Sequence, residues 1–322
     1  MSTASIAGPA TQARGSSAPG QEPRFATLDQ AALAASQAAA LACYTHLAPA
    51  NSVDVHDEAK RAVRSVLARA PGRGMMTAAE LPRDGSSVTC NGERAEPGQG
   101  ARFDVALGLP SAGQVPGLRS RSLASIALAE DGTLRAVDVD PHAQKVLVGP
   151  NARGAVDVRC PIEENLRRVA HALGRPVVGL RVAVLADPMQ AMLVDRLVAL
   201  GVHVHSITGG EISGALAVLL PDGGADVMLG TGSSAEDVLI ACAARAIGGD
   251  MQLSVRSREV GDPTTVLTAE HLVSGQALFA TTAVANGTLL NRPRQAYGYT
   301  QTESLLLVGE TIRKVIEPHR DV

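Results

Sequence analysis

The second half of this 322-residue chain alternates apolar strands with helices, and this alternation restricts the fold more than any other feature. From about Pro161 onward the helices are expected at residues 162–174, 189–201, 211–221 and 235–249, and the strands at 180–186, 202–208, 225–234 and 277–284. Helices that alternate with strands imply layered sheets with helices between and outside them. The sequence therefore predicts an α/β fold.

The first half has a different pattern, with two helices followed by a region of strands. Residues 27–47 are rich in alanine, residues 53–70 carry acids at the start and bases toward the end, and both segments are expected to be helical. Strands are then expected at residues 102–107, 122–129, 134–138 and 145–148. Residues 302–318 close the chain as a further strand, and its continuation into a helix stays open.

These patterns divide the chain into three parts. Residues 1–23 are rich in Ser, Ala, Gly and Pro, and we expect them to form a disordered tail. Residues 24–160 are expected to form an N-terminal α+β half, and residues 161–322 a C-terminal α/β half. We expect the two halves to build one compact unit.

The composition argues against several classes of function. A hydrophobic content of 45% allows a sizeable core, whereas a net charge of −3 and an aromatic content of 2% argue against nucleic-acid binding. The four cysteines are scattered without a CxxC pair, so neither a zinc site nor a disulfide framework is expected. No apolar run reaches the roughly 20 residues of a membrane span. We expect a reduced, cytoplasmic setting.

A glycine-rich turn is the sharpest local motif. In "LGTGSSAEDV" a strand enters Gly230, Gly232, Ser233 and Ser234, and a helix begins near Glu236. Such a turn points backbone N–H groups at an anion, so it could form a phosphate or metal site. It could equally be an ordinary strand–helix turn with a serine N-cap. The sequence "VDVHDEA" leaves a similar choice for Asp54 and His56, between a cation site and a solvated helix start.

Four segments resemble one known family over most of the chain. They are "VLVGPNARGAVDV", "ENLRRVAHALG", "PDGGADVMLGTGSSAEDVLIACAARAIGGDMQ" and "TESLLLVGETIRKVI", and they are similar to class II fructose-1,6-bisphosphatases of the GlpX type. The resemblance implies a layered αβαβα sugar-phosphatase fold, related to inositol monophosphatase, and a homo-oligomer. It also implies hydrolysis of the 1-phosphate of fructose 1,6-bisphosphate, assisted by Mg²⁺ or Mn²⁺ held on carboxylates.

This sequence departs from the family pattern at the residues that do the chemistry. Where the family has Asp-Pro-(Ile/Leu)-(Asp/Glu)-Gly-Thr, Gly108 replaces the first metal-holding acid, Ala112 the second, and Gln114 the threonine that helps to activate water. Of the family's Gly-Glu-Gly-Glu only Glu80 remains. Glu80 and Gln114 are therefore the residues that the resemblance places in a catalytic position.

The substrate-binding segments differ as well. In "DPMQ", Asp187 and Met189 stand where the family has two cations for a phosphate, and Gln190 follows them. The family's Asp-Gly-Asp becomes Gly-Gly-Glu, which ends at Glu211. A phosphate-binding lysine replaced by an aspartate turns attraction into repulsion.

We therefore predict a fructose-bisphosphatase-like protein that acts on or binds a sugar phosphate, with metal-dependent hydrolysis weakened or lost. A residual metal would be held by Glu236, Glu80 and either Asp54 or His56. Substrate binding would fall to Gly230, Gly232, Ser233, Ser234, His142, Asp187, Gln190 and Glu211. Two alternatives stay open: a repurposed, metal-independent enzyme on a different sugar phosphate, and a non-catalytic partner in a hetero-oligomer with an active paralogue.

Overall fold

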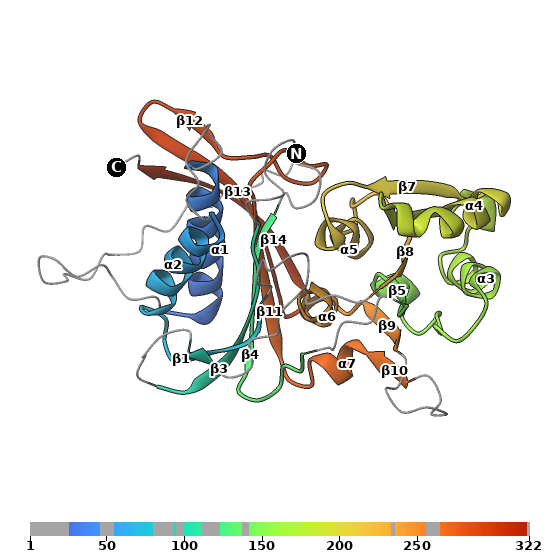
Figure 1. Ribbon diagram of the computed structural model, residues 1–322, viewed down its shortest axis with the longest axis horizontal. Coiled ribbons are helices and arrows are strands. Elements are labelled where there is room, and N and C mark those ends of the chain that lie inside the picture. The colour runs from blue at the N-terminus through green and yellow to red at the C-terminus, as the bar shows by residue number, and fades with distance from the viewer. Residues whose placement is uncertain are drawn as a thin grey trace, which may run out of the picture.

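The computed structural model describes most of the chain after residue 25. The described residues are 26–45, 55–79, 93–94, 100–110, 123–136, 142–232, 236–255 and 265–320. They form two β-sheets and three layers of helices (Figure 1).

The first sheet has eight strands and joins both ends of the chain. Its order is β12-β13-β11-β4-β3-β1-β2, and β14 pairs with β13. The strands are β1 (Arg73–Ala79), β2 (Glu93–Arg94), β3 (Arg102–Gly108), β4 (Leu123–Glu130), β11 (Ala277–Ala283), β12 (Arg294–Ala296), β13 (Tyr299–Val308) and β14 (Thr311–Arg320). Antiparallel pairing of β4 with β11 connects the early strands to the late ones.

The second sheet has six strands in the order β10-β9-β5-β8-β6-β7. These strands are β5 (Gln144–Val148), β6 (Arg181–Leu185), β7 (His203–Ile207), β8 (Val227–Thr231), β9 (Asp250–Val255) and β10 (Thr265–Thr268). Strand β5 lies between β8 and β9 and is antiparallel to both.

Helices cover both sheets and fill the space between them, so the layers follow the order αβαβα (Figure 1). One outer layer holds α1 (Leu28–Thr45) and α2 (Val55–Leu67), and the inner layer holds α5 (Glu211–Leu219), α6 (Glu236–Ile247) and α7 (Ala269–Leu272). The other outer layer holds α3 (Ile162–Ala172) and α4 (Ala191–Ala199). The described residues also include the short 3₁₀ turns η2 (Pro150–Ala152), η3 (Val177–Gly179) and η4 (Pro188–Gln190).

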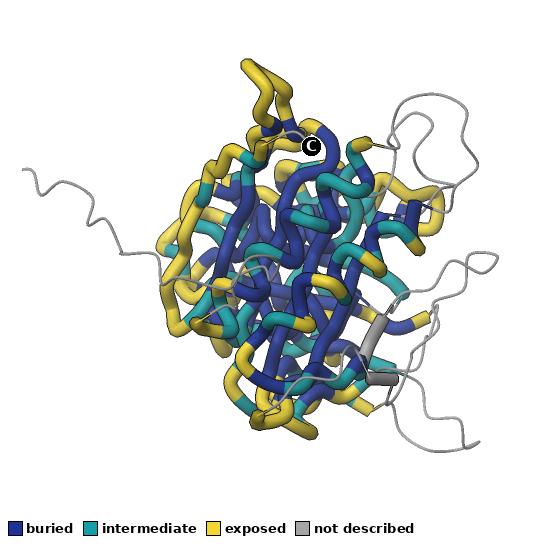
Figure 2. Tube along the Cα trace, turned by 90° about the vertical axis from the view of Figure 1, so that its left-hand side faces the viewer, coloured by how far each residue is buried: buried dark blue, intermediate teal, exposed yellow. Residues whose placement is uncertain are grey.

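Helix composition matches these layers. Helix α1 buries Ala31, Ala35 and Ala39 at intervals of one turn, and these small side chains let it pack closely against α2 and the first sheet. Helix α6 lies between the two sheets, and after its first two residues Arg245 is its only charged residue. All but one of its residues are buried, and buried strands run through the centre of the molecule (Figure 2).

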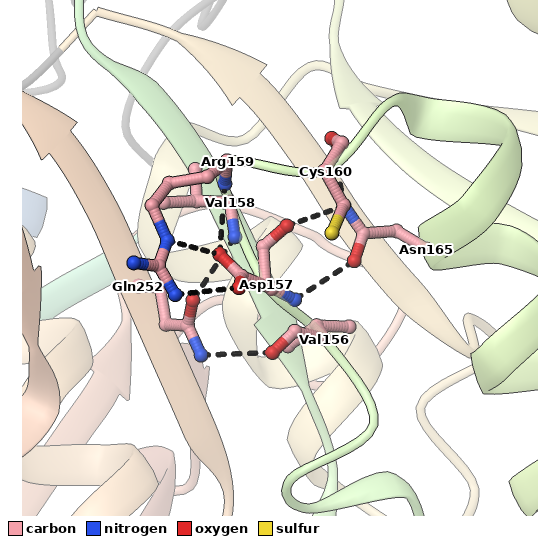
Figure 3. Close-up of polar contacts among 7 residues, drawn as sticks. All are labelled: Val156, Asp157, Val158, Arg159, Cys160, Asn165 and Gln252. Carbon is pink, nitrogen blue, oxygen red and sulfur yellow. Dashed lines mark hydrogen bonds and ion pairs between the residues drawn. The ribbon is translucent and has the colours of Figure 1, made fainter.

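A polar network fastens the segment after η2 to the second sheet and to α3 (Figure 3). The Asn165 amide accepts from the Asp157 N–H at 2.8 Å and donates to the Asp157 carbonyl at 2.8 Å. The Gln252 amide on β9 likewise accepts from Val158 N–H and donates to the Val156 carbonyl. Hydrogen bonds from Arg159 lower the pKa of the Asp157 carboxyl to about 2. Two side-chain amides thereby hold an irregular segment in place.

The predicted α/β class and the αβαβα layering are confirmed, and the expected helices and strands of residues 162–249 are present with ends shifted by a few residues. One prediction is wrong, and one point that the sequence left open is decided. Residues 134–136 form no strand, because the described backbone there makes a single bridge, Leu134 to Val273. Residues 302–318 do not enter a helix but form the β13–β14 hairpin, since Gly309 and Glu310 both have positive φ and reverse the chain.

Some predictions are untested. The tail of residues 1–23 lies outside the described residues, and the division at residue 160 stays a prediction, although each sheet takes strands from both sides of that point. None of the described helices is both long enough and apolar enough to span a bilayer.

The turn after α5 leaves no room for a side chain at Gly223. An added Cβ there would lie 2.3 Å from the Ala217 carbonyl oxygen, which is fixed helix backbone. We expect Gly223→Ala to lower the free energy of unfolding by about 2 kcal/mol, which lowers Tm by roughly 3 °C in calorimetry. Gly230→Ala is the matched control, because its Cβ would meet nothing within 4 Å. Equal melting temperatures for the two variants would contradict this packing.

Candidate functional site

A buried lysine on β5 contacts acidic side chains at the starts of α5 and α6. Lys145 lies on β5, where Val146 and Val148 pack toward α3 and Leu147 packs toward the inner helices, so Lys145 also faces the inner layer. Its Nζ is 2.7 Å from Glu211 Oε2 and also contacts Asp237 Oδ1. Glu211 begins α5, and Asp237 is in the first turn of α6. We call Lys145, Glu211 and Asp237 the Lys145 cluster.

The charges of the Lys145 cluster are mutually dependent. Burial disfavours the ammonium form, but the charges of Asp237 and Glu211 outweigh burial and hold the pKa of Lys145 above its ordinary value. Both carboxylates lie at helix N-termini, where the helix dipole also stabilises negative charge. Glu236, the residue before Asp237, is buried as well. Lys145 is therefore the counter-charge of Glu211 and Asp237, and a third acidic side chain, Glu236, is buried beside Asp237 in the sequence.

The glycine turn lies beside this cluster. Gly230 on β8 is the direct cross-strand neighbour of Lys145 on β5. The Gln190 amide donates to the Thr231 carbonyl at 2.9 Å and accepts from the Thr231 N–H at 3.1 Å, while the Gly232 N–H donates to the Ala143 carbonyl. Gly232 has a φ of +101°, which suits glycine. Gln190 thus clamps the end of β8.

The structure brings some of the predicted site residues together. Gly230, Gly232, Gln190, Glu211 and Glu236 are brought to one region by β8, η4 and the starts of α5 and α6. Asp187 caps η4 by accepting from the Met189 N–H at 2.8 Å. His142 is an exposed residue two positions before β5.

Other predicted residues are separated from this region or not described. His56 is buried in α2, on the opposite face of the first sheet from α6 and Glu236. The remaining predicted residues lie outside the described residues: Asp54, Glu80, Gln114, Ser233 and Ser234. Sequence reasoning missed Lys145 and Asp237. A lysine inside the apolar run "QKVLVG" was the available signal for the first of them.

The end of β3 is closed by apolar side chains. Gly108 is the last residue of β3, and its Cα faces the inner helices. A Cβ added to Gly108 would lie 2.7 Å from Leu239 Cδ1 on α6 and 3.3 Å from Ile212 Cδ1 on α5. The space in front of Gly108 is therefore filled by hydrocarbon, and no acidic side chain fits there without moving Leu239.

A small cavity of about 240 Å³, lined by both apolar and polar side chains, lies next to the start of α5. From β7 and α5 it is lined by Ser206, Thr208 and Ser213, and from the segment after β11 by Asn286 and Thr288. Hydroxyl and amide groups of this kind suit hydrogen bonding to a polyhydroxylated ligand. None of the predicted site residues lines this cavity.

The described residues do not fit a divalent cation. Within that part of the chain, no three His, Cys, Asp or Glu side chains gather closely enough to hold a metal ion. Of the predicted metal ligands, only Glu236 and His56 are described, and they belong to different layers. A divalent cation bound next to a phosphate needs several oxygen ligands. At the end of β3, Gly108 supplies no side-chain oxygen.

Comparison with known proteins decides the family. Residues 26–319 match the family described as bacterial fructose-1,6-bisphosphatase, glpX-encoded. The chain belongs to this family. It is 32% identical over 312 residues to the class 2 fructose-1,6-bisphosphatase of Haemophilus influenzae, covering 88% of this chain and 93% of that protein. It is 28% identical over 311 residues to fructose-1,6-bisphosphatase 1 class 2 of Escherichia coli, covering 88% and 92%. The resemblance read from the sequence is confirmed.

The Lys145 cluster gives a prediction for stability. Lys145→Met leaves Glu211 and Asp237 without their cation, so we expect a loss of about 3–5 kcal/mol of unfolding free energy at neutral pH, measured by urea denaturation. The deficit should shrink as pH falls, because protonation removes the unpaired charges. In the unsubstituted protein the lysine's contribution is complete below pH 10.5 and is lost as pH rises through its higher folded pKa.

Lys314→Met is the control for this variant. Lys314 pairs with Glu303 at 3.1 Å with 47% of its side chain exposed, so its loss should cost at most about 1 kcal/mol. In the triple variant Lys145→Met, Glu211→Gln, Asp237→Asn the large deficit should be mostly recovered. A cost for Lys145→Met no larger than for Lys314→Met would show that the cluster contributes nothing to stability.

Proposed function

We propose that this member of the fructose-bisphosphatase family binds a sugar phosphate in the cytoplasm, and that its metal-dependent phosphomonoester hydrolysis is weakened or lost. One observation carries the proposal, namely the apolar packing of Leu239 and Ile212 against Gly108. The resemblance places a metal-holding acid at this strand end. Here the position has no side chain, and hydrocarbon has taken the space.

The Lys145 cluster supports the same conclusion. Two of the acids near the inner ends of α5 and α6 already have a buried ammonium as counter-charge. A Mg²⁺ or Mn²⁺ ion would have to compete with Lys145 for Glu211 and would be repelled by its charge. The part of Glu236, Glu80, Asp54 and Gln114 in any residual site stays a prediction.

Binding of a sugar phosphate is supported by the names of the relatives and by the hydroxyl and amide groups that line part of the cavity beside α5. The Gly230–Gly232 turn does not line this cavity and would bind the phosphate at a separate place, with Ser233 and Ser234 following it. Asp187 and Gln190 are already engaged with the backbone of η4 and β8, so they would position this turn more than contact the ligand.

The two alternatives predict different behaviour. A repurposed, metal-independent enzyme would need free acid–base groups, but Glu211 is engaged by Lys145 and Asp187 by the Met189 N–H. A non-catalytic partner would instead depend on a homo-oligomer, or on a hetero-oligomer with an active paralogue. Co-purification with an active paralogue, without any response to a sugar ligand, would favour this alternative.

A phosphate-release assay with Mg²⁺ and Mn²⁺ tests the proposal, with fructose 1,6-bisphosphate as substrate and the Haemophilus influenzae relative as positive control. We expect turnover at least about 1,000-fold below the control, equivalent to roughly 4 kcal/mol in the barrier. Isothermal titration calorimetry with the same sugar, without metal, should still detect binding. Turnover comparable to the control would overturn the loss of hydrolysis, and the absence of any binding would overturn ligand recognition.

Restoring the family residues at positions 108, 112 and 114 tests whether their absence causes the expected weak phosphate release. We compare Gly108→Asp, Ala112→Glu, Gln114→Thr alone with the same variant carrying Leu239→Ala, which removes the methyl that lies 2.7 Å from the new Cβ. We expect phosphate release to rise only when Leu239 is also shortened. A rise of the same size in both variants would show that Leu239 does not block the site.

A further inference from the structure

Strand β14 is a long exposed edge of the first sheet. In the described part of the chain it pairs with β13 alone, in an unbroken antiparallel register from Val308–Thr311 to Tyr299–Arg320 (Figure 1). All ten of its residues are exposed or half-buried. An edge of this length presents a row of backbone groups that can pair with another strand.

The backbone groups that point outward can be assigned from Pro318. Pro318 has no N–H, yet it lies inside the continuous register opposite Gln301, so its nitrogen faces away from β13. Backbone direction alternates along a strand, and the outward groups therefore also include those of Ile312, Lys314 and Ile316. The outer edge of β14 thus keeps three consecutive outward residues with both donor and acceptor.

Exposed apolar side chains accompany this edge. Ile312 is 37% exposed and Ile316 54%, and both lie on the same face of the strand. Their cross-strand neighbours are Leu307 and Glu303 on β13. Tyr299, which is 47% exposed, is on the same face farther along the hairpin. Lys314 lies on the same face between the two isoleucines, so apolar and basic side chains alternate beside the unpaired edge.

We propose that β14 pairs antiparallel with β14 of a second copy of this chain, about a two-fold axis at Val315. The two first sheets then join into one continuous sheet. Lys314 of one copy lies opposite Ile316 of the other, and the two residues exchange two backbone hydrogen bonds. The two-fold axis repeats this pair. Ile312 N–H donates to the Pro318 carbonyl of the second copy, so the proline costs only one donor in each strand.

Charge complementarity selects this register. An axis at Val315 sets Arg313 opposite Glu317 of the second copy and Arg320 opposite Glu310, and symmetry repeats both pairs. Arg313 already contacts Asp29 at 2.8 Å, but a guanidinium has donors for two carboxylates. An axis at Lys314 would set that lysine opposite itself, and an axis at Glu317 would set two glutamates together. This surface does not depend on the proposed function of the site.

Disulfide trapping tests the axis. The test variant is Val315→Cys in a chain with Cys90 and Cys160 replaced by Ser. It places the thiols of the two copies directly opposite each other in a non-hydrogen-bonded pair, with Cα atoms about 4.5 Å apart. Mild oxidation should convert most of the protein to a cross-linked dimer on a non-reducing gel. Ile312→Cys is the matched control and should give little cross-link, because it faces Pro318 of the second copy. Equal cross-linking of both variants, or none at Val315→Cys, would overturn the register.

Blocking the edge provides an independent test by sedimentation of the full chain. Ile316→Pro removes an outward N–H and leaves the β13 ladder intact, so the mass should fall to half that of the unsubstituted protein, with an unchanged circular dichroism spectrum. Tyr297→Ser, at the exposed tip of the β12–β13 hairpin, should leave the mass unchanged. A single-chain mass for the unsubstituted protein, or an unchanged mass for a folded Ile316→Pro variant, would refute the pairing.

Discussion

The contact of Lys145 with Glu211 and Asp237 is the interaction on which the inner part of the molecule depends. It connects the second sheet to the first turns of two inner helices, and one of these, α6, packs against both sheets. Buried charges are tolerated only when they are paired, so the positions of β5, α5 and α6 are fixed relative to one another. The same contact uses carboxylates that could otherwise have attracted a cation. The contact that orders these elements therefore also occupies acidic side chains at the starts of α5 and α6.

The packing of α6 between the two sheets is the feature that this chain needs for its layered fold. The apolar residues of α6 fill the space between the sheets as a layered phosphatase fold requires, and Leu239 belongs to that packing. Without a side chain at Gly108, the δ-methyl of Leu239 extends to the end of β3. The apolar packing that holds the layers together thus extends to the end of this strand.

Much of this architecture could be predicted from the sequence, because α3 to α6 and the strands between them follow local periodicity. The β13–β14 hairpin could not, since its turn places Glu310, a non-glycine residue, at positive φ and lacks the usual Asn-Gly signal. The strand expected at residues 134–138 failed because alternation does not supply a partner strand. The Lys145 cluster was missed because its acids lie 66 and 92 positions away in the chain, and only the fold brings them together.

The pairing of β4 with β11 has a consequence for biosynthesis. The first sheet is incomplete until β11 and β13 emerge, although α1 and α2, which it must cover, are made first. For most of translation these early helices lack the side chains of Ala280 and Leu306 that complete their core. Such high contact order makes folding slow and leaves apolar surface exposed on the nascent chain. The protein is therefore expected to depend on chaperones until its last strands have been released.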